Sequence, residues 1–175
     1  MSDMSKKWFA IPVILLALWG CYTVSFNLVR HSGYYAQHLP HKKGTNPELI
    51  FTLKHLYYLE KPDNSNLRYD YDGSNTIIVN EEYFIDNHQD PKILLSRANS
   101  NSTSTSYQFD NKGQFITKRI INRTTSKSQH SESSESKEEA MAYVERAIRP
   151  ILDVQPKPKH NLQWLFNLIY QRKFQ

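Results

Sequence analysis

The chain has 175 residues, a formal net charge of +5 and a single cysteine, Cys21. It contains one long apolar run in an otherwise polar sequence, which excludes an integral protein with several spans and leaves about 130 residues for one modest soluble domain. Its basic residues are scattered among acidic ones, so no nucleic-acid partner is expected. Because Cys21 lies inside the apolar run, the soluble part has no disulfide and no thiolate ligand or nucleophile.

The apolar run covers residues 8–29, after a short tail at 1–7. No charged side chain occurs between Lys7 and Arg30, and about 22 helical residues extend roughly 33 Å, enough to cross the hydrocarbon core of a bilayer. The pattern predicts an uncleaved transmembrane signal anchor, and the membrane bilayer is therefore the first expected partner.

Two other readings of this segment stay open. A cleaved signal peptide would need a site of the small-x-small type, for which Thr23-Val24-Ser25 is a poor match. Residues 18–21 resemble the lipobox of bacterial lipoproteins, with the bulky Trp19 as a departure, so Cys21 is a possible lipidation site. The sequence after Cys21 stays apolar, which favours the spanning anchor over the lipoprotein.

The charges that flank the segment indicate its orientation only slightly. Lys6 and Lys7 precede it, and Arg30, Lys42 and Lys43 follow it. A very short tail with two lysines next to the apolar run favours retention of the tail in the cytoplasm. The expected product is a single-pass membrane protein whose soluble domain lies on the exported side, periplasmic or extracellular.

Residues 30–44 are expected to form an irregular membrane-proximal linker, and 45–175 a soluble domain. The domain begins with a helix start signal, in which Thr45 or Asn46 caps a helix with Pro47 in its first turn. The following leucines fit either a helical stripe or strand alternation; the start signal favours a helix that ends before Pro62.

Short β-prone runs separated by turn residues then predict an antiparallel sheet of about four strands. Residues 110–113 (Asp-Asn-Lys-Gly) form a hairpin signal between two of these runs. The runs are 67–71, 76–79, 92–96, 106–109 and 114–121, with 81–85 as a further candidate. Lys118 and Arg119 in the last run are expected to mark a solvated face or a protected edge.

Two serine-rich stretches interrupt this pattern. Residues 99–106 are expected to be a mobile loop. The stretch 123–137 contains almost no apolar residue, so disorder is expected there. Ser136 and Glu139 form a capping box for a helix that ends at Pro150.

A last helix is predicted over 161–173. The whole pattern predicts an α+β protein, with an N-terminal transmembrane helix followed by a small antiparallel β-sheet domain with flanking helices.

Three groups of residues were weighed as chemical sites. Residues 70–75 resemble a calcium loop but lack its later ligands, and a hairpin turn explains them better. The histidines His31, His38 and His41 have no further ligand in view, so no metal is assigned. The carboxylates Glu81, Glu82, Asp86 and Asp90 are not fixed as a catalytic pair. No catalytic residue, cofactor-binding residue or cofactor is therefore assigned.

The last helix is the most distinctive segment of the soluble part, because it combines large apolar side chains with flanking lysines and arginines. It is expected either to close the core or to lie on a membrane or a partner. The possible contact residues are Leu162, Trp164, Leu165, Phe166, Ile169 and Tyr170.

These features favour a membrane-anchored envelope protein that acts as a protein–protein interaction or structural module with an unidentified protein partner. One alternative is a membrane-tethered enzyme with a site between Glu81 and Asp90. Another is a lipid- or ligand-binding domain, possibly a lipoprotein, that uses the inner face of its sheet.

Overall fold

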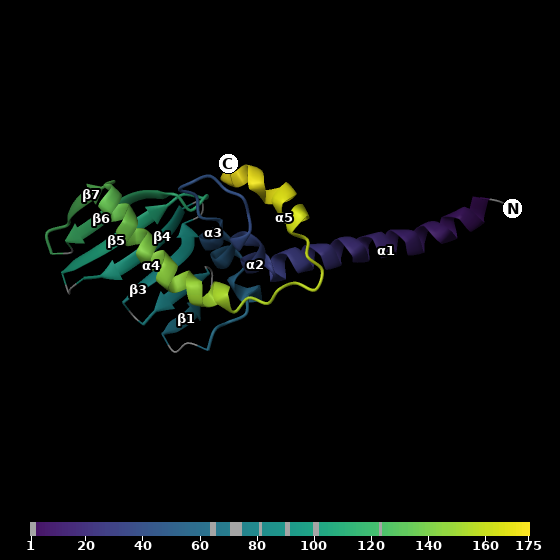
Figure 1. Cartoon of the computed structure of the whole chain (residues 1–175), viewed down its shortest axis with the longest axis horizontal. Coiled ribbons are helices and arrows are strands. Elements are labelled where there is room, and N and C mark those ends of the chain that lie inside the picture. Colours follow the sequence, from purple (N-terminus) through teal and green to yellow (C-terminus); the bar gives the residue numbers. More distant parts are fainter. Residues whose placement is uncertain are drawn as a thin grey trace.

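The computed structural model describes residues 3–63, 66–70, 75–80, 82–89, 92–99, 102–122 and 124–175, with the backbone alone at 3–10 and 88–89. A long helix, α1 (Asp3–Arg30), projects from a globular body formed by the rest of the chain (Figure 1). Its large apolar side chains between Ile11 and Tyr22 are exposed. Among the described residues it is the one helix long and apolar enough to cross a membrane, which makes it a candidate anchor or signal sequence.

The body contains one antiparallel sheet of seven strands, in which neighbours in sequence are neighbours in space. The strands are β1 (Leu67–Asp70), β2 (Thr76–Val79), β3 (Tyr83–Gln89), β4 (Lys92–Ala98), β5 (Thr103–Phe109), β6 (Phe115–Asn122) and β7 (Lys127–Ser131). Alternation along these strands places apolar side chains such as Ile77, Ile85, Leu95 and Tyr107 on one buried face. The α+β class is confirmed, although the sheet is larger than the four strands expected.

Helices cover that buried face. They are α2 (Ser32–Gln37), α3 (Pro47–Lys54), α4 (Ser134–Asp153) and α5 (Gln163–Tyr170), with 3₁₀ turns η1 (Leu56–Tyr58) and η2 (Gln171–Phe174). Figure 1 shows α4 lying across the sheet, where it contacts β2 and β6. Its inward residues Ala140, Val144, Ala147, Ile148 and Ile151 are buried. A single apolar core therefore fills the space between helices and sheet.

Several local predictions are confirmed by the geometry. The Asn46 side chain caps α3 by accepting a hydrogen bond from the Leu49 N–H at 2.8 Å. In the β5–β6 hairpin, Asp110 Oδ1 accepts from the Lys112 and Gln114 N–H groups, both at 2.8 Å. Gly113 supplies the positive φ of +73° that the turn requires.

The structure differs from the prediction of a linker at 30–44. This region contains α2, and Tyr35 and Leu39 belong to the core. The aromatic side chain of Tyr35 is buried by contacts with residues distant in the chain, which a local reading of 30–44 does not reveal.

The prediction of disorder at 123–137 is wrong where the structure describes the segment. β7 pairs with β6 through backbone hydrogen bonds, although most of its side chains are exposed. Backbone pairing with an existing strand requires no apolar side chain, so composition alone does not predict it. Ser133, not Ser136, caps α4, accepting from the Ser136 N–H at 3.2 Å.

The remaining boundary differences are small. The helix predicted to reach Pro62 stops at Lys54 and is followed by η1. β5 begins at Thr103, inside the loop expected at 99–106. α4 continues through Pro150 to Asp153.

Candidate functional site

The six predicted contact residues of the C-terminal helix differ in exposure: some are buried and others are exposed. Phe166 is buried, with its ring 4.8 Å from that of Phe51 and 5.3 Å from that of Tyr35. It is therefore a core residue and is not accessible to a partner. Leu162, Leu165 and Tyr170 are partly buried against the core. Trp164 and Ile169 are exposed, together with the neighbouring Leu168; these three residues are called the α5 strip below.

The three histidines considered as metal ligands, at positions 31, 38 and 41, each contact a backbone carbonyl instead of one another. Nδ1 lies 3.2 Å from Pro156 O in His31, 2.9 Å from Tyr34 O in His38 and 2.8 Å from Leu39 O in His41. The described part of the chain contains no group of three or more His, Cys, Asp or Glu side chains placed to hold a metal ion.

The acidic candidates are only partly described. Glu81 and Asp90 lie outside the described residues, as do positions 71–74 of the loop that resembles a calcium site. Glu82 is exposed before β3, whereas Asp86 is buried on β3, opposite Thr76 and Leu94. Cys21 is exposed on α1.

The sheet face opposite the helices is open and carries a groove of about 470 Å³. A row of side chains from five successive strands crosses it. Each residue is the direct cross-strand partner of the next, so all of them point to the same face: Ile78, Phe84, Ser96, Ser106 and Arg119. We call this set the open-face row. Leu94, Gln108 and Ile121 also line the groove.

Arg119 is the unusual member of this row. Its Nε is buried and has no hydrogen-bond partner, and no residue in the described part of the chain forms an ion pair with its guanidinium. Glu82 is the one acidic residue among the described residues that line the groove. A buried N–H left without an acceptor costs about 1–3 kcal/mol, so the Arg119 Nε destabilises the folded domain by about this amount.

Lys118 and Arg119 were expected to mark a solvated face or a protected edge. The edge is excluded, because β6 lies between β5 and β7. They point to opposite faces. Lys118 Nζ lies 2.5 Å from Glu139 Oε2 on α4. Burial raises the pKa of the nearby Tyr107 hydroxyl, and its hydrogen bond to Glu139 raises this pKa further. Lys118, Tyr107 and Glu139 thus link α4 to the sheet.

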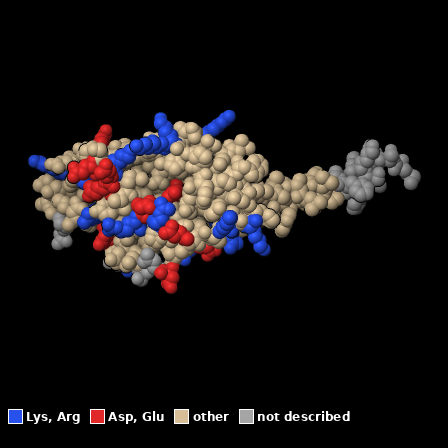
Figure 2. Space-filling model, in the orientation of Figure 1, with Lys and Arg blue, Asp and Glu red and all other residues tan. Residues whose placement is uncertain are grey.

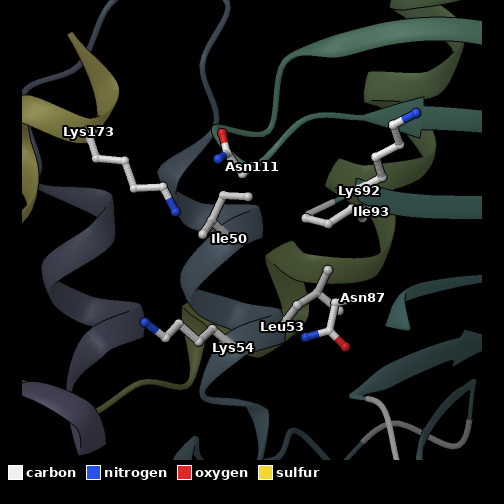
Figure 3. A pocket seen from close by; sticks show the side chains of 8 residues that line it. All are labelled: Ile50, Leu53, Lys54, Asn87, Lys92, Ile93, Asn111 and Lys173. Atoms are coloured by element: carbon white, nitrogen blue, oxygen red, sulfur yellow. The ribbon is translucent and has the colours of Figure 1, made fainter. Parts of the chain in front are cut away.

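A second hollow, of about 270 Å³, lies between α3, the β3–β4 hairpin and the C-terminal η2 (Figure 3). Its lining includes the apolar Ile50, Leu53 and Ile93, and three lysines. The Lys173 amine points toward Ile50, whereas Lys54 and Lys92 extend away from the centre. The pocket therefore has a basic rim without convergent donors, and it is a weaker candidate for anion binding than the groove.

Comparisons with protein-family models, with curated proteins and with solved structures found no match to this chain. Sequence reasoning missed the open-face row, because the row depends on the register of five strands. The available signal was the alternation of side chains in β5 and β6. It places Ser106 and Arg119 on one face of the sheet and Tyr107 and Lys118 on the other.

Proposed function

We propose that this chain is a single-pass membrane protein with its domain on the exported side, and that the domain is an interaction module that binds a protein partner. The exposed apolar surface of α1 supports the anchor, and the lysines before it support the orientation. The observation that carries the binding role is the position of Arg119 in the lining of a groove on the open face of the sheet, where no residue in the described part of the chain forms an ion pair with it.

The open-face row indicates the chemistry of the partner. Strands are about 4.8 Å apart, so the row from Arg119 on β6 to Ile78 on β2 extends about 19 Å, the length of roughly six extended residues. It offers a cation at one end, serine hydroxyls in the middle and the apolar Phe84 and Ile78 at the other end. These groups fit an extended peptide segment in which a carboxylate is followed, several residues away, by an apolar side chain.

Both alternatives have less support. The inner face of the sheet, where a lipid or other ligand was considered, is filled by buried side chains such as Tyr83, Tyr107 and Phe109. In the acidic stretch considered for an enzyme, Glu82 is exposed and Asp86 is buried. The groove is the larger hollow and combines apolar walls with a few polar groups, as ligand sites generally do.

A hexapeptide library displayed on phage and panned against the full chain in lipid nanodiscs tests this proposal. We expect enrichment of peptides with Asp or Glu near one end and apolar residues near the other. Arg119→Gln should weaken their binding roughly 10- to 150-fold, the equivalent of a charge-assisted hydrogen bond of about 1.5–3 kcal/mol.

Arg68→Gln is the matched control. Arg68 pairs with Ile78 and so lies on the same face, but it does not line the groove, and its replacement should leave the affinity unchanged. Peptides that bind the wild type and the Arg119→Gln variant equally, or a library without any enrichment that depends on Arg119, would refute the proposed binding role.

The anchor is tested separately. We expect the full chain to stay in the membrane pellet after carbonate extraction, and protease added outside the cell or spheroplast to digest the domain. The intact mass should be that of the unprocessed chain. An acylated Cys21 at a new N-terminus would contradict the spanning anchor and support the lipoprotein.

A further inference from the structure

We infer that the α5 strip (Trp164, Leu168 and Ile169) lies in the interfacial region of the bilayer that α1 crosses, so that the domain contacts the membrane at a second point. This inference rests on the membrane anchoring proposed for α1. It names a lipid surface, and not a protein, as the partner of this exposed apolar helix face.

Hydrogen bonds place the start of α5 beside the last turns of α1. The Tyr35 hydroxyl donates to Asn27 Oδ1 on α1 at 2.7 Å and accepts from the Leu162 N–H at 3.1 Å. The Gln163 side-chain amide donates to Tyr35 O at 3.0 Å. A single buried tyrosine thus joins the first turn of α5 to Asn27, and Figure 1 shows α5 next to the point where α1 leaves the domain.

The position of Asn27 along α1 determines the depth at which the start of α5 lies relative to the bilayer. With a rise of 1.5 Å per residue, Asn27 lies about 28 Å along the helix axis from Trp8, close to the roughly 30 Å thickness of the hydrocarbon core. If hydrocarbon begins at Trp8, it ends near Asn27. The first turn of α5 then lies at the boundary between acyl chains and headgroups.

The side chains at this level suit that boundary. Trp164, Leu168 and Ile169 are 66%, 70% and 50% exposed. Trp164 and Leu168 are four residues apart and so lie on one side of α5. Tryptophan is enriched at the interface because its ring is apolar and its N–H is polar.

Basic residues surround the same level. Lys157 and Lys159 lie in the loop that leads to α5. Two carbonyls of this loop contact the membrane-proximal region: Pro156 O lies 3.2 Å from His31 Nδ1, and His160 O lies 3.3 Å from the Tyr35 hydroxyl oxygen. Figure 2 shows an uncharged stretch of α1 and, on the part of the domain next to it, lysine and arginine side chains. This charge complements anionic headgroups, which favours a bilayer over a protein as the occupant.

Tryptophan fluorescence tests the inference, because the chain has three tryptophans and two of them are in α1. In the variant Trp8→Phe/Trp19→Phe, Trp164 is the sole reporter. The full chain is reconstituted in phosphatidylcholine–phosphatidylglycerol vesicles that contain lipids brominated either near the headgroup or deep in the acyl chains. We expect blue-shifted emission from Trp164 and stronger quenching by the shallow bromines than by the deep ones.

The matched control is Trp8→Phe/Trp164→Phe, which leaves Trp19 in the middle of α1. Its emission should be quenched most strongly by deep bromines. If Trp19 is quenched and Trp164 is not, the bilayer contact of α5 is refuted while the anchor stands. If neither is quenched, the proposed anchoring itself fails. Far-UV circular dichroism matching the wild type establishes that both variants are folded.

Replacing Lys157 and Lys159 with glutamine distinguishes the lipid from other occupants. We expect the double variant to lose part of the Trp164 quenching in vesicles with phosphatidylglycerol. Burial of Trp164 that rises with protein concentration and is insensitive to brominated lipid would instead show contact between copies of the chain and would overturn the inference.

Discussion

Acidification should destabilise the domain through His55, a buried histidine at the end of α3. The side chain is 8% exposed, and its Nδ1 has no hydrogen-bond partner among the described residues. Burial, with a smaller contribution from the charge of Lys54, lowers the pKa of His55 from 6.5 to about 4. The folded domain thus holds His55 neutral over a pH range in which the unfolded chain protonates it.

The sign and magnitude follow from this difference. At pH 7 His55 is largely neutral in both the folded and the unfolded state, so its protonation has little effect on the free energy of unfolding. As the pH falls from about 6.5 to about 4, the unfolded state binds a proton that the folded state does not, and stability is lost. Each unit of pKa shift corresponds to about 1.4 kcal/mol, so the full loss is about 3.5 kcal/mol. About 3 kcal/mol of it is reached at pH 4, where half of the folded molecules are protonated at His55.

The variant His55→Leu removes the titrating group and keeps an apolar side chain beside Phe51. Urea unfolding of the full chain in detergent micelles, followed by near-UV circular dichroism at pH 7, 6, 5 and 4, gives the free energy of unfolding of both proteins. The free energy of unfolding of the variant, measured relative to that of the wild type, should rise by about 3 kcal/mol between pH 7 and pH 4.

The difference in the free energy of unfolding between the two proteins cancels the contributions of groups that titrate in both. One such group is Glu48. Burial raises the pKa of its carboxyl group, and the charge of Arg149 lowers it by a smaller amount. A difference that stays constant from pH 7 to pH 4 would refute the reasoning, since it would mean that His55 is protonated equally readily in the folded domain.

Two further substitutions, both measured by urea unfolding, probe the contacts that position the β5–β6 hairpin and α1. Gly113→Ala should destabilise the domain more than Gly44→Ala: both positions have positive φ, but a Cβ at 113 would meet Asn46 O at 2.7 Å, whereas the nearest atom at 44 is Lys137 Nζ at 3.7 Å. The excess should be about 1–3 kcal/mol, and equal costs would show that the hairpin moves away freely. Tyr35→Phe should cost about 1–3 kcal/mol, because the Leu162 N–H loses its acceptor, and it should speed amide exchange at Leu162. Tyr34→Phe, which removes a hydroxyl outside this hydrogen-bond network, should have little effect; equal exchange in both variants would refute the link between α1 and α5.

Features that depend on short-range chemistry were readable from the sequence. The charge-free run of 8–29 predicts a long apolar helix, and the cap at Asn46 and the Asp110–Gly113 turn are correct in the structure. Each of these signals involves residues within a few positions of one another, so the local backbone preferences and the first hydrogen bonds are decided by neighbours in the chain.

Features that depend on residues far apart were decided only by the tertiary structure. β7 is polar and exists because β6 offers it unpaired backbone groups, and α2 exists because Tyr35 is buried by α5 and by α1. Arg119 becomes a candidate binding residue only when the register of five strands aligns it with Ser106, Ser96 and Phe84. A one-residue shift in register would turn its side chain to the other face, and alternation within β6 alone does not specify which face the helices cover.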